Sequence, residues 1–198
     1  MSLQCCEGLH AIVLAAGASS RFGSVKQLAR IDGQPLLNTL VNRTCEVVDE
    51  VLVVLGAHAA ELAPMLSHLR ASVVINRGWE EGVASSIRAG IARLPASCTG
   101  ALLVLADQAR VTAQDLRHLG AAWQHQPDSI VAARFGAITG APAIFPRCVF
   151  SDLNELRGDV GARRVIERHV SRLTAVPMPN AAFDVDTPED LAALSQHA

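Results

Sequence analysis

Short apolar runs alternate with amphipathic stretches along almost all of the 198-residue chain. The runs have the length and β-branched content of buried strands, and helical spacing of apolar residues fills most of the intervals between them. Strands that alternate with helices over several units predict a parallel, doubly wound sheet with helices on both faces. The strand candidates are residues 10–15, 51–55, 72–75, 101–105, 130–133, 143–145 and 173–176.

The alternation breaks between residues 134 and 146, where no helical pattern separates two strand candidates. An antiparallel strand or hairpin in this segment would make the sheet mixed. The chain has no internal repeat and no linker rich in Gly, Ser or Pro. We therefore expect one α/β domain over residues 1–198, in which residues 1–9 form a flexible N-terminal extension.

Three helices are expected to begin at recognisable signals. Pro35 suits the first position of a helix, where its missing N–H costs nothing. Thr112 and Asp115 have the spacing of a capping box. At the last helix, Thr187 is the expected N-cap, with Pro188 at the first helical position.

Composition limits the classes of protein that the chain can belong to. Half of its residues are apolar and 18% are charged, which is typical of a compact globular protein and excludes a largely disordered one. The net charge is −2 and no basic stripe favours nucleic acid, so an anionic substrate has to be bound by local charges. Five scattered cysteines without a Cys-x-x-Cys pair indicate reduced thiols and a cytoplasmic protein. No apolar run reaches membrane-spanning length, and we expect neither a membrane partner nor export.

The segment from Ala16 to Lys26 is a loop of small residues that contains two cations. It follows the first strand candidate, and open α/β sheets bind ligands at the carboxyl ends of their strands. Gly17 lets main-chain N–H groups face an anion, while Arg21 and Lys26 add positive charge, so the loop suits a polyphosphate. Its spacing fits neither a Walker A loop nor a dinucleotide-binding fingerprint. The alternative is a flexible turn with two solvated cations.

Three aspartates are candidates for a metal site. Asp107 follows a buried strand candidate, and an ionised carboxylate there needs a partner, such as Mg²⁺ bound together with phosphate oxygens. Asp184 and Asp186 flank Val185, and both would point to the same face if this segment were a strand. For all three the alternative is a role in turns or helix caps, and Asp190 is expected to cap.

Two further loops could bind substrate. Asn76 and Gly82 bracket a loop that contains Trp79, with Ser86 in the helix that follows, and this set could hold a nucleobase. Alternatively Trp79 fills the core, as Trp123 is expected to do. The segment 158–164 places two glycines and two arginines around a short helix start, which suits a phosphate but also fits a solvated surface turn. The histidines show no metal-ligand spacing, and no serine has the context of a nucleophile.

These segments together resemble a known family. Leu14-Ala15-Ala16-Gly17-Ala18-Ser19-Ser20-Arg21-Phe22-Gly23, followed by Lys26-Gln27-Leu28, is similar to the L-A-A-G-x-S-x-R-[MF]-G-x-x-K-x-L opening of nucleotidyltransferases. The family's later motifs follow in order over almost the whole chain, at residues 76–86, 106–108, 140–145, 158–163 and 184–190. Within the family the chain looks most like the molybdenum cofactor cytidylyltransferases (MobA/MocA-like).

This resemblance implies a three-layer, Rossmann-like fold and a specific reaction. CMP would pass from CTP to the terminal phosphate of molybdopterin, with release of pyrophosphate and with a molybdoenzyme as the recipient of the product. Mg²⁺, or Mn²⁺, would be bound by Asp107 and Asp186, and the catalytic residues would be Arg21, Lys26 and Asp107. The implied nucleotide-binding residues are Leu14, Ala15, Ala16, Gly17, Arg21, Lys26, Asn76, Gly82 and Ser86. The implied acceptor-binding residues are Gly140, Pro142, Asp159, Gly161 and Arg163.

Other interpretations stay open. The chain has Ala109, Val83 and Ala141 where the family usually has Pro, Met and often His, which affects the acceptor and base pockets more than the charged site. Ala16, where guanylyltransferases tend to have Gly, favours cytidylyl transfer. The alternatives are a guanylyl- or cytidylyltransferase for a sugar or polyol phosphate, and a non-catalytic pterin- or nucleotide-binding chaperone for a molybdoenzyme.

Overall fold

A computed structural model describes residues 7–31 and 33–195, and its centre is a seven-stranded sheet. All seven expected strands are present, and only β8 runs against its neighbours β6 and β7, so the sheet is mixed as expected. In spatial order the strands are β5 (Ser72–Ile75), β4 (Glu50–Leu55), β1 (Leu9–Ala15), β6 (Gly100–Leu105), β8 (Ile138–Pro146), β7 (Ile130–Phe135) and β9 (Leu173–Pro177).

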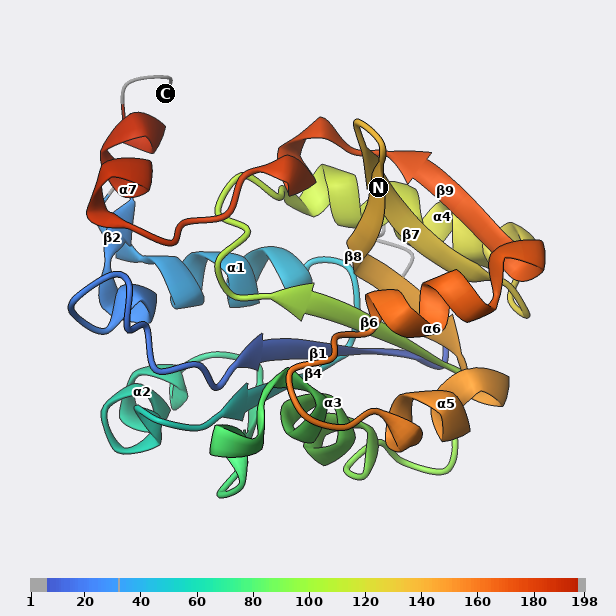
Figure 1. Cartoon of the computed structure of the whole chain (residues 1–198), viewed down its shortest axis with the longest axis horizontal. Helices are drawn as coiled ribbons and strands as arrows, with labels where there is room; N and C mark the ends of the chain where they lie inside the picture. The colour runs from blue at the N-terminus through green and yellow to red at the C-terminus, as the bar shows by residue number, and fades with distance from the viewer. Residues whose placement is uncertain (1–6, 32, 196–198) are drawn as a thin grey trace.

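Helices cover both faces of this sheet, which gives the three layers (Figure 1). One apolar core contains residues of α1 (Leu36–Cys45), α2 (Ala59–Leu66) and α4 (Ala113–His125). The other contains residues of α3 (Val83–Ile91), α5 (Phe150–Glu155) and α6 (Arg163–Arg168). Alternate residues of the strands enter the two cores: in β1, Ala11 and Val13 lie in the first, and Ile12 and Leu14 in the second. A strand buried on both faces has to be apolar throughout, which explains the uninterrupted runs.

Short elements complete the chain. A two-stranded ladder of β2 (Arg30–Ile31) and β3 (Gln34–Pro35) lies next to α7 (Pro188–Ser195), at the left of Figure 1. The 3-10 helices are η1 (Lys26–Leu28), η2 (Trp79–Glu81), η3 (Arg147–Val149), η4 (Val170–Arg172) and η5 (Pro179–Ala182). No helix among the described residues is long and apolar enough to cross a membrane.

Two of the three expected helix starts are confirmed and the third is shifted. Thr112 and Asp115 form the capping box of α4, and the Thr187 hydroxyl accepts a hydrogen bond from the Asp190 N–H at the start of α7. Pro35 is the N-cap of α1 rather than its first helical residue. The reason is its extended backbone (ψ 139°), which pairs with Arg30 in the β2–β3 ladder.

The N-terminal extension is shorter than expected. Leu9 already belongs to β1, since it is buried and pairs with Gly100 of β6. Residues 1–6 of the expected extension lie outside the described ranges, and so do the first two cysteines. Cys45, Cys98 and Cys148 are free thiols. As expected, Trp123 is a core residue, with 4% of its surface exposed.

Gly90 provides a test of how tightly α3 packs on the sheet. A Cβ at this position would lie 2.6 Å from Ile12 Cγ2 and 3.3 Å from Val54 Cγ2. Helix propensity alone would make Gly90→Ala stabilising by about 1 kcal/mol. We expect the crowding to outweigh this gain and to lower the free energy of unfolding by about 1–3 kcal/mol, measured by urea denaturation.

Ala121→Gly is the matched control for this measurement. Ala121 is exposed in α4, so this change isolates helix propensity and should cost about 1 kcal/mol. A Gly90→Ala protein that is more stable than the wild type would show that α3 can move away from the sheet without loss.

Candidate active site

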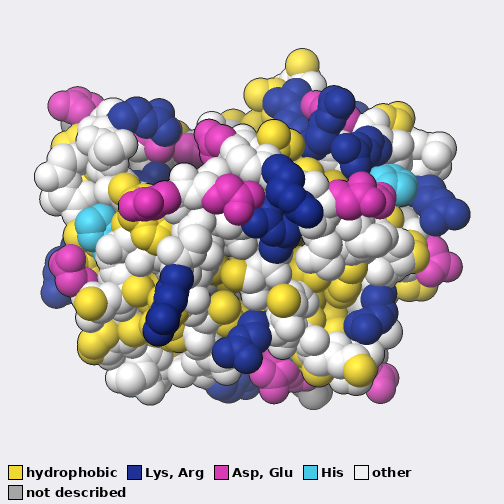
Figure 2. Space-filling view, turned by 60° about the horizontal axis from the view of Figure 1, so that its bottom comes forward, with side chains coloured by type: hydrophobic (Ala, Val, Ile, Leu, Met, Phe, Trp, Pro, Cys, Tyr) yellow, Lys and Arg dark blue, Asp and Glu magenta, His cyan; other side chains and the backbone are white. Residues whose placement is uncertain are grey.

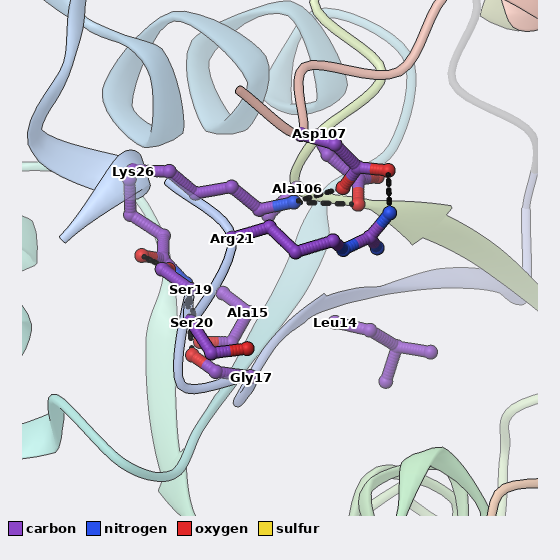
Figure 3. Close-up of a pocket in the computed structure, with 11 residues that line it drawn as sticks. Leu14, Ala15, Gly17, Ser19, Ser20, Arg21, Lys26, Ala106 and Asp107 are labelled. Carbon is purple, nitrogen blue, oxygen red and sulfur yellow. Dashed lines mark hydrogen bonds and ion pairs between the residues drawn. The ribbon is translucent and has the colours of Figure 1, made fainter. Parts of the chain in front are cut away.

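One ammonium group joins three segments that are distant in the sequence. Lys26 Nζ, in η1, donates hydrogen bonds to Asp107 Oδ2 at 3.0 Å, to Asp186 Oδ1 at 3.1 Å and to the Val185 carbonyl at 3.1 Å. Asp107 follows β6, whose carboxyl end lies beside that of β1, so the turn after β6 meets the loop that leaves β1. Figure 3 shows the Lys26 side chain extending toward the Asp107 carboxylate. The expected meeting of the cationic loop with both acids is therefore present.

Lys26 is the only lysine of the chain, and its side chain is 14% exposed. Burial by itself lowers the pKa of Lys26, but the charges and hydrogen bonds of Asp107 and Asp186 outweigh it and raise the pKa above its ordinary value. The ammonium group is therefore a permanent cation near neutral pH. Its chemistry here is electrostatic and not that of a general base.

Arg21 makes a different kind of contact. Its Nη1 lies 2.9 Å from Asp186 Oδ2, but its side chain is 74% exposed. Exposed ion pairs contribute little to stability, about 0–1 kcal/mol. Arg21 can therefore leave Asp186 for a stronger anion at small cost.

The backbone around these cations forms a hollow that we call the loop cavity, with a volume of about 210 Å³. It is lined by Leu14, Ala15, Gly17, Ser19, Ser20, Arg21, Lys26, Gln27, Ala106, Asp107 and Asp186. A Cβ on Gly17 would meet nothing within 4 Å, so the glycine faces open space in which a ligand fits.

Gln27 holds this loop in shape, and sequence reasoning missed it. Its side chain is buried, donates to the carbonyls of Ala15 and Gly17 at 3.4 Å each, and accepts a hydrogen bond from the Ser19 hydroxyl at 3.0 Å. The sequence shows only that a polar residue stands between Lys26 and Leu28. That this position is buried is visible only in the structure. Its role shows only when the loop folds back over it.

A second hollow, the Trp79 cavity, adjoins the first and has a volume of about 380 Å³. It shares Leu14, Gly17 and Asp107 with the loop cavity. Its other lining residues are Ala16, Ala18, Trp79, Gly82, Val83, Ser86, Leu105 and Asp159. Trp79 therefore faces a cavity and does not fill the core. Asp159, expected on the acceptor side, lies here because the backbone of residues 158–159 packs against Gly82.

Asn76 has a supporting position instead of a place in the wall of this cavity. It is buried, and its amide nitrogen donates to Ser85 Oγ at 2.7 Å and to Ser86 Oγ at 3.0 Å. Its side-chain oxygen accepts a hydrogen bond from the Gly78 N–H at 2.9 Å. With both ends engaged inside the protein, Asn76 fixes the Trp79 loop relative to α3.

A third hollow, the apolar cavity, has a volume of about 280 Å³. The expected acceptor residues Gly140, Gly161 and Arg163 line it, but Pro142 does not. The register of β8 against β7 shifts at this point, because Ala132 pairs with Ala143 but Ala133 pairs with Gly140. Regular alternation is therefore interrupted beside Pro142, and both Gly140 and Ala141 line the cavity. The remaining wall is formed mainly by apolar side chains of β6, α3 and α6, together with Gln108 and Asp184.

The two acids of the last segment are directed to different cavities. Residues 184–186 do not form a strand. The Val185 N–H donates to the Asp107 carbonyl at 2.9 Å. With the segment held in this way, Asp186 lines the loop cavity and Asp184 lines the apolar cavity. Desolvation, together with the charges of Asp107 and Asp186, raises the pKa of Asp184 to about 6, although Lys26 opposes this shift. The backbone N–H groups of Asp186 and Thr187 donate to Asp190, the capping residue.

The charged groups of the loop cavity fit a divalent cation shared with a phosphate ligand. Asp107 Oδ1 is buried and has no hydrogen-bond partner in the described part of the chain, and carboxylate oxygens are ligands that Mg²⁺ and Mn²⁺ prefer. No three His, Cys, Asp or Glu residues in that part are arranged to hold a metal by themselves. Further ligands would have to be phosphate oxygens or water. On the face seen in Figure 2, cationic and anionic side chains are interspersed, so neither sign of charge dominates that face.

The fold is that of a nucleotidyltransferase. Residues 11–173 match the MobA-like NTP transferase domain family, and the chain belongs to this family.

Relatives and solved structures are similar to nearly the whole chain. The purine catabolism protein PucB of Bacillus subtilis is 29% identical over 92% of this chain and 93% of its own length. A probable molybdenum cofactor guanylyltransferase of Nostoc is 25% identical over 94% and 90%. The structure of Rv0371c from Mycobacterium tuberculosis is 30% identical over 96% and 99%, with a TM-score of 0.82. A structure of Rv0371c in complex with manganese superposes with a TM-score of 0.78, at 27% identity over 96% and 99%.

Gly82 controls how the Trp79 loop meets residues 158–159. Its φ is +116°, and a Cβ there would lie 2.5 Å from the Gly158 carbonyl oxygen. Gly82→Ala should therefore lower the free energy of unfolding by about 1–3 kcal/mol through strain and crowding, measured by thermal or urea denaturation. Nucleotide affinity, measured by calorimetry, should fall with it, since the wall of the Trp79 cavity has to shift.

Gly33→Ala separates strain from crowding in this experiment. Gly33 also has a positive φ (+79°), but a Cβ there would meet nothing within 4 Å. This control should cost less than Gly82→Ala and leave nucleotide binding unchanged. Equal effects of the two substitutions on binding would contradict the position assigned to Gly82.

Proposed function

We propose that this protein transfers CMP from CTP to the terminal phosphate of molybdopterin and releases pyrophosphate. The observation that carries the proposal is the convergence of Lys26 with Asp107 and Asp186, beside a loop with open space over Gly17. A phosphate oxygen of the acceptor would attack the α-phosphorus of the nucleotide, and the P–O bond to pyrophosphate would break. Such chemistry needs positioning and charge neutralisation, and no covalent enzyme intermediate.

Side chains of the loop cavity would supply these two requirements. The backbone N–H groups after β1, Arg21 and Lys26 would bind the triphosphate, whose charge would draw both cations from the carboxylates. Asp107 and Asp186 would then hold Mg²⁺, or Mn²⁺, which when bound neutralises phosphate charge and polarises the reacting phosphate. Gln27 would keep the loop in its binding shape through its bonds to Ala15 and Gly17.

The three cavities suggest where the parts of the substrates lie. The Trp79 cavity would take the base and ribose, next to Gly82 and Ser86. The apolar cavity would take the acceptor beyond its phosphate, next to Arg163. Because Asp107 lines the loop cavity and the Trp79 cavity, and Leu14 lines all three, both substrates would meet at the triphosphate. A molybdoenzyme would receive the product in the cytoplasm.

A second candidate differs in the nucleotide. The Nostoc relative is described as a probable molybdenum cofactor guanylyltransferase, which favours GTP. Ala16 favours CTP, because guanylyltransferases tend to have Gly there. The same site chemistry serves both nucleotides, and the walls of the Trp79 cavity would decide between them.

Pyrophosphate release tests the reaction directly. The protein is mixed with molybdopterin and each of the four nucleoside triphosphates in turn, and pyrophosphate is measured by an enzyme-coupled assay. We expect pyrophosphate release with CTP and Mg²⁺, and retained activity with Mn²⁺. A chelator should abolish release, because without a divalent cation the two carboxylates would repel the triphosphate. Replacing molybdopterin with a polyol phosphate should abolish release. If none of the four nucleotides supports release, the protein is not this enzyme.

Lys26→Met tests the cation that joins the site. We expect turnover to fall about 10²–10³-fold, since one preorganised group that stabilises developing charge is lost. Circular dichroism and cooperative thermal unfolding should remain, because the apolar cores do not contain Lys26. Lys26→Arg should recover part of the activity, since it keeps the charge without the compact ammonium group.

Arg93→Met serves as the control for loss of one positive charge. Arg93 is exposed just beyond the end of α3, and its replacement should leave turnover unchanged. A folded Lys26→Met protein with wild-type turnover would remove Lys26 from the mechanism.

A further inference from the structure

An ion pair joins the Trp79 loop to α3. Arg88, in the second turn of α3, donates from Nη1 to Glu81 Oε1 at 3.0 Å and from Nη2 to Glu81 Oε2 at 2.6 Å. The contact is therefore bidentate, which fixes the direction as well as the distance of the two side chains. The hydrogen bonds from Arg88, and after them the one from the Gly158 N–H, lower the pKa of Glu81 below its ordinary value, so its carboxylate stays ionised near neutral pH.

The same two side chains also hold the segment that follows α5. Arg88 Nη1 donates to the Leu156 carbonyl at 2.6 Å. Glu81 Oε1 accepts a hydrogen bond from the Gly158 N–H at 3.2 Å. The backbone adds a third bond, from the Ala84 N–H to the Gly158 carbonyl at 3.2 Å. This segment, which crosses α3 in Figure 1, is thus fastened to the start of the helix, and we call Glu81 and Arg88 the α3 clamp.

Both partners of this joint line two cavities at once. From the start of α3, the lining residues are Gly82, Val83 and Ser86 for the Trp79 cavity, and Val83 and Ile87 for the apolar cavity. From the fastened segment onward, they are Asp159 for the Trp79 cavity and residues 161–163 for the apolar cavity. Neither Glu81 nor Arg88 is among the described lining residues of the three cavities. The clamp can therefore act on a ligand only through the walls that it holds.

The alternative is that the clamp only stabilises the fold. Exposed ion pairs contribute little to stability, and this pair is partly exposed, with 25% of the Arg88 side chain and 40% of the Glu81 side chain accessible to solvent. A comparable pair, Arg117 with Glu46, has a distance of 2.6 Å and exposed fractions of 35% and 51%, and it joins α4 to the residue after α1. Neither of these two residues is among those described as lining the three cavities. The second pair is therefore a matched control, an ion pair of similar geometry that holds no cavity wall.

We propose that Glu81 and Arg88 are positioning residues that set the distance between α3 and residues 156–163, and with it the fit of the nucleotide in the Trp79 cavity. The inference rests on the proposed function in one respect, that the Trp79 cavity takes the base and ribose of the nucleotide. Because the same two walls continue into the apolar cavity, a displaced joint changes both cavities together. The clamp thereby keeps the two substrates at a fixed spacing without touching either.

Nucleotide affinity of a clamp variant tests this inference. Isothermal titration calorimetry with each of the four nucleoside triphosphates and Mg²⁺, without an acceptor, identifies the tightest ligand, which we expect to be CTP. Arg88→Met should weaken its binding about 5- to 50-fold, because small displacements of a site wall are costly even when the replaced residue lies away from the ligand. Arg117→Met should leave binding unchanged. Unchanged binding in Arg88→Met, or equal losses in the two variants, would overturn the inference.

Two further variants separate positioning from support of the fold. Arg88→Lys keeps the charge without the bidentate fork and should bind the nucleotide with intermediate affinity. Glu81→Met and Arg88→Met together should weaken binding by less than the two single changes predict when they are added, since the two residues act as one unit. If the clamp is only structural, urea denaturation will show a loss of stability while nucleotide affinity stays at the wild-type value.

Hydrogen exchange of the wild-type protein gives a readout that needs no variant. Binding of the nucleotide should slow amide exchange in residues 156–163, because these residues and α3 close on the same ligand. Exchange there that does not change on saturation with nucleotide would overturn the inference, even if the variants fail to fold.

Pyrophosphate release separates this inference from the proposed function. A wild-type protein that releases pyrophosphate with molybdopterin, but binds nucleotide no better than Arg88→Met does, would refute only the positioning role. One that binds nucleotide and loses affinity on Arg88→Met, yet releases no pyrophosphate, would refute only the proposed reaction. A protein that binds none of the four nucleotides would refute both.

Discussion

The Lys26 ammonium group binds two carboxylates, Asp107 and Asp186, which lie 81 and 160 residues further along the chain. Without Lys26, the exposed Arg21 would be the remaining cation among the described residues that line the loop cavity. Asp107 and Asp186 would then repel each other, because partly buried carboxylates repel unless a cation lies between them. Under the proposed function, the same three groups would lie beside the bound triphosphate. Stability of the empty site and readiness for an anionic ligand therefore have one electrostatic origin.

The placement of the last segment depends on a second set of contacts. The Val185 N–H bonds to the Asp107 carbonyl, and Val185 packs with Phe22 and Leu36 in a small apolar cluster below the site. Arg110 stacks on Phe183 at 4.2 Å, which ties the turn after β6 to the same segment. These contacts put Asp186 and Asp184 on opposite sides of one backbone segment, so that a single stretch of chain lines both the loop cavity and the apolar cavity.

The strands and the chemical nature of the site were predictable because they depend on local patterns. Uninterrupted apolar runs identify strands buried on both faces, and a loop of small residues with Lys26 indicates an anion site wherever it lies. The roles of Asn76, Pro142 and Asp159 were not predictable in this way. Asn76 supports its loop because Ser85 and Ser86 come within hydrogen-bonding distance, and Pro142 is absent from the apolar cavity at the point where the register of β8 against β7 shifts. Gln27 was missed because only folding of the loop buries it.

The sequence by itself determined the alternation of strands and helices, the capping of α4 and α7, and the set of charged residues available for phosphate chemistry, since each follows from residue type and short-range spacing. The tertiary structure alone decided which of those residues meet, and that Asp184 and Asp186 line different cavities. The physical reason is that hydrogen bonds and ion pairs act over a few ångströms. Whether residues more than 80 positions apart come that close depends on how the sheet and its loops pack.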